Sequence, residues 1–130
     1  MLISKRGEAM CILIYEEDRK RRTMLERTIM QYERKKEFAI KVKSFDDAQE
    51  AFLHAQQNHI EAAFISMEDR YGHGFFLAKK LKKKNPHLNL IPMSMEPRFE
   101  KELMNMHISG YLAGLCTKGK ILEELENLRY

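Results

Sequence analysis

The strongest constraint in this sequence is an uncharged run at 62–67, reading AAFISM, in which Ser66 is the one polar residue. A short continuous apolar run predicts a strand that is buried on both faces. A polar loop with two glycines, Gly72 and Gly74, follows the run, and a helical pattern begins after it. We therefore expect a central strand that delivers one polar side chain, that of Ser66, to the rim of a sheet.

The rest of the chain alternates short apolar segments with amphipathic helical segments. Strands are predicted at 11–15, within 37–44, up to Ser66, at 88–94 and at 110–114. Helices are predicted after an Asp18 N-cap, after a capping box at 44–47, from about Gly74 to Lys84, from 96–97 and after a Thr117 N-cap. Five such β-α units imply a parallel sheet that is covered by helices on both faces.

Two strands carry features that limit their place in the sheet. The alternation of Phe38, Ile40 and Val42 with polar residues is typical of a half-exposed or edge strand. Pro92 lies inside the predicted strand at 88–94, where a proline cannot donate a ladder hydrogen bond. The proline therefore conflicts locally with a central position for this strand.

Right-handed crossovers place the carboxyl ends of all parallel strands at one edge of the sheet. A ligand crevice is expected at that edge, where the order of the strands reverses. The residues predicted to lie there are Glu16, Glu17, Ser66, Ser94, Gly114 and Leu115.

Composition excludes several classes of protein. The 130 residues are 44% hydrophobic and 32% charged, which predicts one soluble globular domain. No apolar run approaches the roughly 20 residues of a membrane helix. The two cysteines have no metal or redox spacing and lie at opposite edges of the predicted sheet, so no disulfide is expected. With a formal charge of +4 and a solvated lysine run at 79–84, direct nucleic-acid binding is not expected.

The domain is predicted to occupy 10–130, after a flexible leader at 1–9. The leader has charges but no apolar core segment, so it does not read as a secretory signal. Together with the few cysteines, this predicts a cytoplasmic protein.

Residues 10–129 resemble the receiver domain of bacterial two-component response regulators. The resemblance is carried by the strand and acidic residues at 12–18 (ILIYEED), by 61–81 without a gap, and by Gly110-Tyr111-Leu112. The sequence is most similar to receivers that precede LytTR-type DNA-binding domains. The resemblance implies a flavodoxin-like (βα)5 fold, a three-layer sandwich whose five parallel strands follow the order 2-1-3-4-5.

The resemblance also implies functions for individual positions. Glu16 and Glu17 stand where the family has the acidic pair that holds Mg²⁺, and carboxylate oxygens suit that ion. Ser94 stands where a hydroxyl contacts the phosphoryl group. Tyr111 stands where an aromatic residue changes rotamer on activation.

Two positions depart from the family pattern in ways that affect the chemistry. Ser66 replaces the aspartate that accepts the phosphoryl group, and a serine hydroxyl needs a nearby base to become nucleophilic. Gly114 replaces the lysine that pairs with the phosphate, which removes a cation from the site. Leu115 replaces the proline that follows that lysine.

The sequence therefore predicts a pseudo-receiver that is not an enzyme and takes part in phosphorelay signalling through protein contacts. No cofactor is expected beyond a weak or lost Mg²⁺ site at Glu16 and Glu17. The partner would be a histidine kinase or an output module, and 97–129 is the candidate surface for a homodimer.

Two alternatives remain open. One is an active, atypical receiver that is phosphorylated at a displaced carboxylate, with Glu68 and Asp69 as candidates. The other is a flavodoxin-like nucleotide-binding protein or enzyme. Against the second, the loop after the first strand reads Glu-Glu-Asp instead of a glycine-rich phosphate loop.

Overall fold

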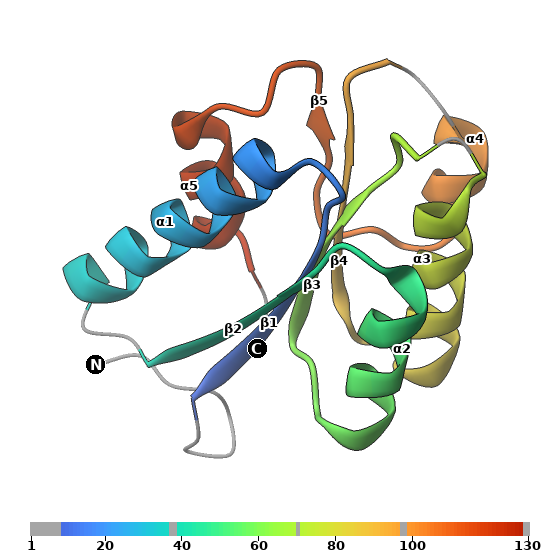
Figure 1. Cartoon of the computed structure of the whole chain (residues 1–130), viewed down its shortest axis with the longest axis horizontal. Helices are drawn as coiled ribbons and strands as arrows, with labels where there is room; N and C mark the ends of the chain where they lie inside the picture. Colours follow the sequence, from blue (N-terminus) through green and yellow to red (C-terminus); the bar gives the residue numbers. More distant parts are fainter. Residues whose placement is uncertain (1–8, 37–38, 70, 97–98, 129–130) are drawn as a thin grey trace.

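The computed structural model describes residues 9–36, 39–69, 71–96 and 99–128. In these residues strands and helices alternate along the chain (Figure 1). The strands are β1 (Met10–Tyr15), β2 (Ile40–Phe45), β3 (Ala62–Ser66), β4 (Asn89–Ser94) and β5 (Leu112–Ala113). The helices are α1 (Arg19–Lys36), α2 (Ala48–Gln57), α3 (His73–Lys84), α4 (Glu100–Met104) and α5 (Lys118–Glu126).

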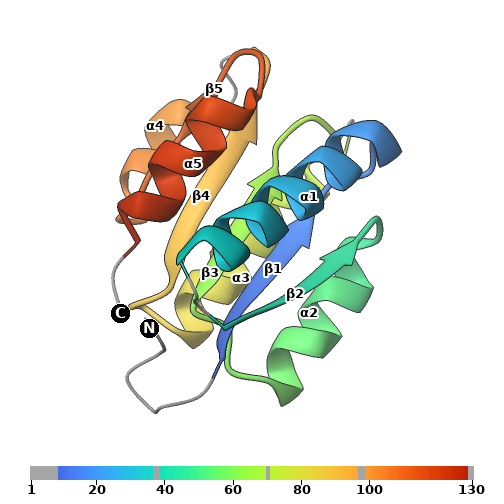
Figure 2. The same cartoon turned by 90° about the vertical axis from the view of Figure 1, so that its left-hand side faces the viewer.

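The strands form one sheet in the order β2-β1-β3-β4-β5, and every pairing is parallel. Helices α1 and α5 lie side by side on one face, and α2, α3 and α4 cover the other (Figures 1 and 2). This confirms the predicted three-layer (βα)5 architecture and the predicted strand order. The predicted leader lies outside the described residues, apart from Ala9.

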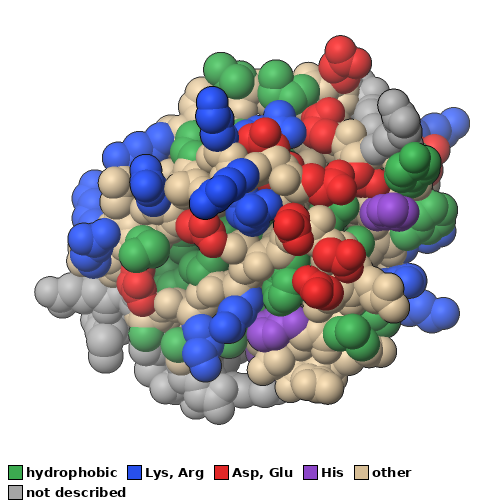
Figure 3. All heavy atoms as spheres, viewed as in Figure 1, with side chains coloured by type: hydrophobic (Ala, Val, Ile, Leu, Met, Phe, Trp, Pro, Cys, Tyr) green, Lys and Arg blue, Asp and Glu red, His purple; other side chains and the backbone are tan. Residues whose placement is uncertain are grey.

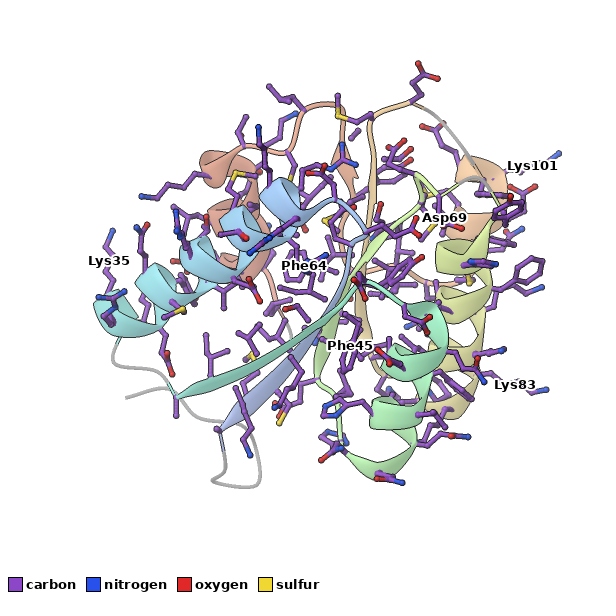
Figure 4. The ribbon with its side chains drawn as sticks, in the orientation of Figure 1. Lys35, Phe45, Phe64, Asp69, Lys83 and Lys101 are labelled. Atoms are coloured by element: carbon purple, nitrogen blue, oxygen red, sulfur yellow. The ribbon has the colours of Figure 1, made fainter. Side chains whose placement is uncertain are left out.

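The two central strands, β1 and β3, supply both halves of the core. Ile14 and Phe64 belong to the cluster under α1 and α5, and Figure 4 shows Phe64 between the sheet and α1. Leu13 and Ile65 belong to the cluster under α2 and α3. All five residues of β3 are buried, which confirms the prediction drawn from the apolar run.

The edge strand β2 alternates as predicted. Ile40 and Val42 are half-buried, whereas Lys41 and Lys43 are exposed. Phe38, the first residue of the predicted alternation, lies outside the described residues. Because β2 pairs only with β1, its second flank is at the edge of the sheet.

The predicted capping box at 44–47 is wrong. Ser44 belongs to β2, where it is paired with Ile14, and its hydroxyl donates to the carboxylate of Glu26. The N-cap of α2 is Asp47, whose carboxylate accepts the N–H of Glu50 at 2.9 Å. Pairing with β1 keeps the chain extended as far as Phe45. The helix α2 therefore begins after Asp47 and not after Ser44.

The structure resolves the conflict at Pro92. The carbonyl oxygens of Leu90 and Ser94, two residues to either side, accept N–H groups from the β5 side at 2.9 and 2.8 Å. The carbonyl of Met93 instead accepts the N–H of Met67 on the β3 side. Backbone groups alternate in direction along a strand, so the proline nitrogen faces β5. Because β5 pairs only with the last two residues of β4, the missing donor falls before that pairing begins.

The last strand and the fourth helix are shorter than predicted. β5 has two residues, Leu112 and Ala113, where 110–114 was expected, and they pair with the last two residues of β4. α4 begins at Glu100, after Phe99, whose ring stacks on that of Phe75 at 4.4 Å. The predicted helix start at Pro97 lies outside the described residues.

The two other predicted N-caps, Asp18 and Thr117, are confirmed. The Asp18 carboxylate accepts the N–H of Arg21 at 2.9 Å at the start of α1, and the Thr117 hydroxyl accepts the N–H of Lys120 at 3.3 Å at the start of α5. Both cysteines are free thiols. None of the helices in the described ranges combines the length and the apolar character that are needed to cross a membrane.

Gly74 should tolerate no side chain, because a Cβ atom there would lie 1.9 Å from the carbonyl oxygen of Ser66. We expect Gly74→Ala to lower the free energy of unfolding by about 2 kcal/mol or more, since α3 would have to move away from the end of β3. The measurement is urea unfolding followed by circular dichroism.

Gly119→Ala is the matched control. Nothing lies within 4 Å of the corresponding Cβ position in α5, so the helix propensity of alanine should raise stability by about 0.5–1 kcal/mol. Equal effects of the two substitutions would contradict the close approach of α3 to β3.

Candidate functional site

A small pocket lies at the edge where the parallel strands end. Asp and Glu side chains gather on this upper side of the molecule, with Lys and Arg beside them (Figure 3). The free volume of the pocket is about 10 Å³, which is about the least that admits one water molecule. Its lining residues are Glu16, Arg21, Leu25, Ser66, Glu68, Met93, Ser94, Met95, Leu112, Gly114 and Cys116.

Glu16 is the buried carboxylate of the pocket. It follows β1 directly, and its side chain is 4% exposed. One carboxylate oxygen accepts the backbone N–H of Asp18 at 3.0 Å, and the other accepts Nε–H of Arg21 at 3.0 Å. Burial raises the pKa of Glu16, while these two contacts act in the opposite direction. The carboxylate is thus enclosed together with its counter-charge.

Glu17, the other residue of the predicted acidic pair, is exposed and does not line the pocket. The guanidinium of Arg22 donates to the backbone carbonyls of both residues, at 2.8 Å to Glu16 and 3.4 Å to Glu17. The structure therefore brings only one of the two glutamates into the site.

Ser66 and Ser94 lie in the pocket as predicted, and each is only 3% exposed. The hydroxyl oxygen of Ser66 accepts the N–H of Glu68 at 3.3 Å. The hydroxyl of Ser94 donates to the carbonyl of Glu96. Both serines are therefore engaged by the loops that follow their own strands.

Tyr111 packs, half-buried, against the cluster under α2 and α3. Burial is the main cause that raises its pKa, and the carboxylates of Glu100 and Glu68 raise it further. A side-chain hydrogen bond with Ser94 lowers it and joins the predicted switch residue to the pocket.

Gly114 lines the pocket in a left-handed conformation, with φ of +73°. The Nζ atom of Lys120 lies 3.9 Å from the position that a Cβ atom would take there, and it donates to the carbonyl of Ala113 at 2.9 Å. Leu115, which was expected at the same edge, is exposed and is not part of the pocket.

Among the lining residues that sequence reasoning did not place in the pocket, three have ionisable side chains. Arg21 lies three residues after the Asp18 cap, so its position in the first turn of α1, above the pocket, was a usable signal. Glu68 follows Ser66 by two residues and was considered only as a displaced phosphorylation site. Cys116 follows Gly114 by two residues, and its pocket position depends on the loop between β5 and α5.

The buried carboxylate of Asp69 caps α3. It accepts the N–H of His73 at 2.5 Å and the N–H of Gly74 at 2.9 Å (Figure 4). The oxygen that accepts the N–H of His73 also lies 3.7 Å from Nδ1 of the same residue. Anionic groups are stabilised at the N-terminus of a helix, so Asp69 has a structural role there. It does not line the pocket.

The pocket residues do not fit a Mg²⁺ ion well. Mg²⁺ requires octahedral coordination by oxygen and keeps several waters. Both oxygens of Glu16 accept hydrogen bonds from the chain, and a carboxylate oxygen of Glu68 accepts the N–H of Met95. Among the described residues no group of three or more His, Cys, Asp or Glu side chains could hold a metal ion.

Comparison of the whole fold with solved structures identifies its type. The response regulatory domain of protein mrkE from Klebsiella pneumoniae superposes with a TM-score of 0.79 at 18% identity, covering 92% of this chain and 94% of that chain. Chemotaxis protein CheY4 of Vibrio cholerae gives a TM-score of 0.76 at 16% identity, covering 93% and 99%.

A third match is the response regulator protein TrrA of Thermotoga maritima in complex with Mg²⁺ and BeF, with a TM-score of 0.76 at 13% identity and coverage of 92% and 99%. This chain has the receiver-domain fold. No family model matches the sequence, and no curated protein matches it either. At these identities the likeness concerns the fold, and the chemistry has to be argued from the pocket.

Removing the Asp69 carboxylate should destabilise the domain. We expect Asp69→Ala to lower the free energy of unfolding by about 2 kcal/mol, because two N–H groups of α3 lose their acceptor, and Asp69→Asn to lower it by less. Chemical denaturation measures both. The exposed Glu17→Ala should change stability by less than about 0.5 kcal/mol. A loss at Glu17 as large as that at Asp69 would contradict the capping role.

The thiol of Cys116 should titrate above its ordinary pKa. Burial is the main cause, and Glu16 adds to it, while Arg21 and Lys120 act in the opposite direction. A raised pKa leaves less thiolate at neutral pH, and the thiolate is the reactive form. In a Cys11→Ala background, the pH midpoint of iodoacetamide alkylation should therefore lie above that of an ordinary cysteine peptide, and Glu16→Gln should move it down. A midpoint below the peptide value would contradict this.

Proposed function

We propose that this domain is a pseudo-receiver, a signalling module that has lost ordinary phosphotransfer and acts by binding other proteins. One observation carries the proposal. The pocket presents the hydroxyl of Ser66 at the end of β3, and its two lining carboxylates, Glu16 and Glu68, already accept hydrogen bonds from the chain.

The chemistry of phosphoryl transfer supports this proposal. A serine hydroxyl needs a general base within hydrogen-bond reach, and the hydroxyl of Ser66 instead accepts the N–H of Glu68. Phosphoryl transfer also needs cations around the transferred group. Arg21 is a cation of the pocket, but it is paired with Glu16. These contacts favour a site that keeps the arrangement of a receiver pocket but does not transfer a phosphoryl group.

The surface around β5 is the expected site of protein binding. Met104 of α4 and Leu115 after β5 are 64% and 67% exposed, and Met95 at the end of β4 is 43% exposed. β5 is the last strand of the sheet, so one of its flanks has no partner strand. In this proposal the partner is a histidine kinase, an output module or a second copy bound through 97–129, and Tyr111 is held by local packing.

A displaced phosphorylation site is the second candidate, and Glu68 is the observation in its favour. It is the second carboxylate of the pocket and lies two residues beyond Ser66. The capping role of Asp69 argues against that residue as the acceptor. A nucleotide-binding role has less support, because the carboxylates of Glu16 and Asp18 already accept the N–H groups at the start of α1.

The test is incubation of the purified domain with acetyl phosphate and Mg²⁺, followed by intact mass spectrometry. We expect no phosphoryl adduct, because a serine hydroxyl is a poor nucleophile without a general base, and the carboxylates of Glu16 and Glu68 already accept hydrogen bonds from the chain. Beryllofluoride with Mg²⁺ should likewise produce no saturable change in tyrosine fluorescence.

The proposal is wrong if a stoichiometric adduct forms. In that case Glu68→Gln and Ser66→Ala distinguish the two possible acceptors, since only the variant that lacks the acceptor should lose the adduct. An aspartate-containing receiver treated in parallel is the positive control.

A further inference from the structure

We propose that Arg21 is an internal cation that takes the place of a metal ion in this pocket and keeps the domain insensitive to Mg²⁺. The inference rests on the proposed function and gives it a physical cause. It assigns Arg21 a role in closing the site, in addition to the loss of the aspartate and lysine.

The buried carboxylate of Glu16 needs its negative charge to be balanced. Enclosing a single carboxylate in a protein is costly unless an opposite charge and hydrogen bonds compensate it. Nε of Arg21 lies 3.0 Å from one oxygen of Glu16, and the N–H of Asp18 lies 3.0 Å from the other. A cation that is part of the chain therefore supplies the compensation that a bound ion would otherwise supply.

Arg21 is fixed in position by Asp18. Its backbone N–H donates to the Asp18 carboxylate at 2.9 Å, and its Nε lies 3.9 Å from the same carboxylate. Asp18 thus caps the first turn of α1 and also positions the side chain of Arg21, which extends from that turn into the pocket. The side chain of Arg21 is 36% exposed and lines the pocket, so it lies between the buried Glu16 and solvent.

The backbone oxygens that could complete a coordination shell around a metal ion also have donors within the chain. Arg22 donates to the carbonyl of Glu16 at 2.8 Å and to that of Glu17 at 3.4 Å. Two consecutive arginines therefore engage the carboxylate of Glu16 and the carbonyls of the loop that follows β1. The remaining free volume of about 10 Å³ admits about one water molecule, whereas Mg²⁺ keeps several waters when it binds.

The experiment compares the thermal stability of the wild-type protein and two variants with and without 10 mM Mg²⁺, at matched ionic strength and without any phosphodonor. Wild-type protein should show no Mg²⁺-dependent shift of Tm. Arg21→Ala exposes the Glu16 carboxylate and should gain a shift of about 3–5 °C, as expected for a site of millimolar affinity. Arg27→Ala removes the same charge from an exposed position of α1 and should respond like wild type.

A double variant identifies the ligand. In Glu16→Gln/Arg21→Ala a neutral amide replaces the carboxylate, so the Mg²⁺-dependent shift of Tm should disappear. Mn²⁺ used as a paramagnetic probe should broaden the amide signals around Glu16 in Arg21→Ala only. If Arg21→Ala does not fold, Arg21→Gln replaces it, since the amide keeps a donor toward Glu16 without the charge.

The inference is overturned if wild type and Arg21→Ala respond to Mg²⁺ equally, or if neither the alanine nor the glutamine variant responds. Such a failure is distinct from a failure of the proposed function. The stability measurements contain no phosphodonor, whereas the pseudo-receiver proposal fails only if the wild-type domain is phosphorylated.

Discussion

The structure depends on the parallel pairing of β3 with β1 on one side and with β4 on the other. This pairing leaves β3 no edge, and the helices leave it no exposed face, so every residue from Ala62 to Ser66 is buried. Because all the strands run in the same direction, the residues at their carboxyl ends meet at one edge. Glu16, Ser94 and Gly114 therefore converge on Ser66 although they are far apart in the sequence.

Within that frame, the buried carboxylate of Glu16 determines how the pocket is arranged. Its charge needs compensation, and α1 starts at the right place to provide it through the N–H of Asp18 and the guanidinium of Arg21. Glu68 is likewise engaged, by the N–H of Met95. Under the proposed function, a pocket that satisfies its own charges needs neither a metal ion nor a phosphoryl group to be stable. Such a pocket suits a domain that works through its surface.

Most of the fold could be predicted from local pattern, and the errors have identifiable causes. Asp18 and Thr117 were recognised as caps because each lies directly before an amphipathic stretch. Ser44 was taken as a cap for the same reason, but pairing with β1 extends β2 to Phe45 and leaves the role to Asp47. The last strand was predicted too long because its length depends on pairing with β4, which joins segments that are distant in the sequence and covers only Leu112 and Ala113.

The sequence by itself determined the βα repeat and the buried central strand, because hydrophobic periodicity is a local property of the chain. It also placed Ser66, Ser94 and Gly114 at one edge, because strands that run in the same direction end at the same edge of the sheet. Only the tertiary structure decided that Glu17 faces solvent, that Asp69 caps α3 and that Arg21 reaches Glu16. The reach of a long side chain depends on the angle at which its helix crosses the sheet. The apolar run at 62–67 predicted where a polar side chain would emerge, but the charges around Ser66 became known only when the helices were placed.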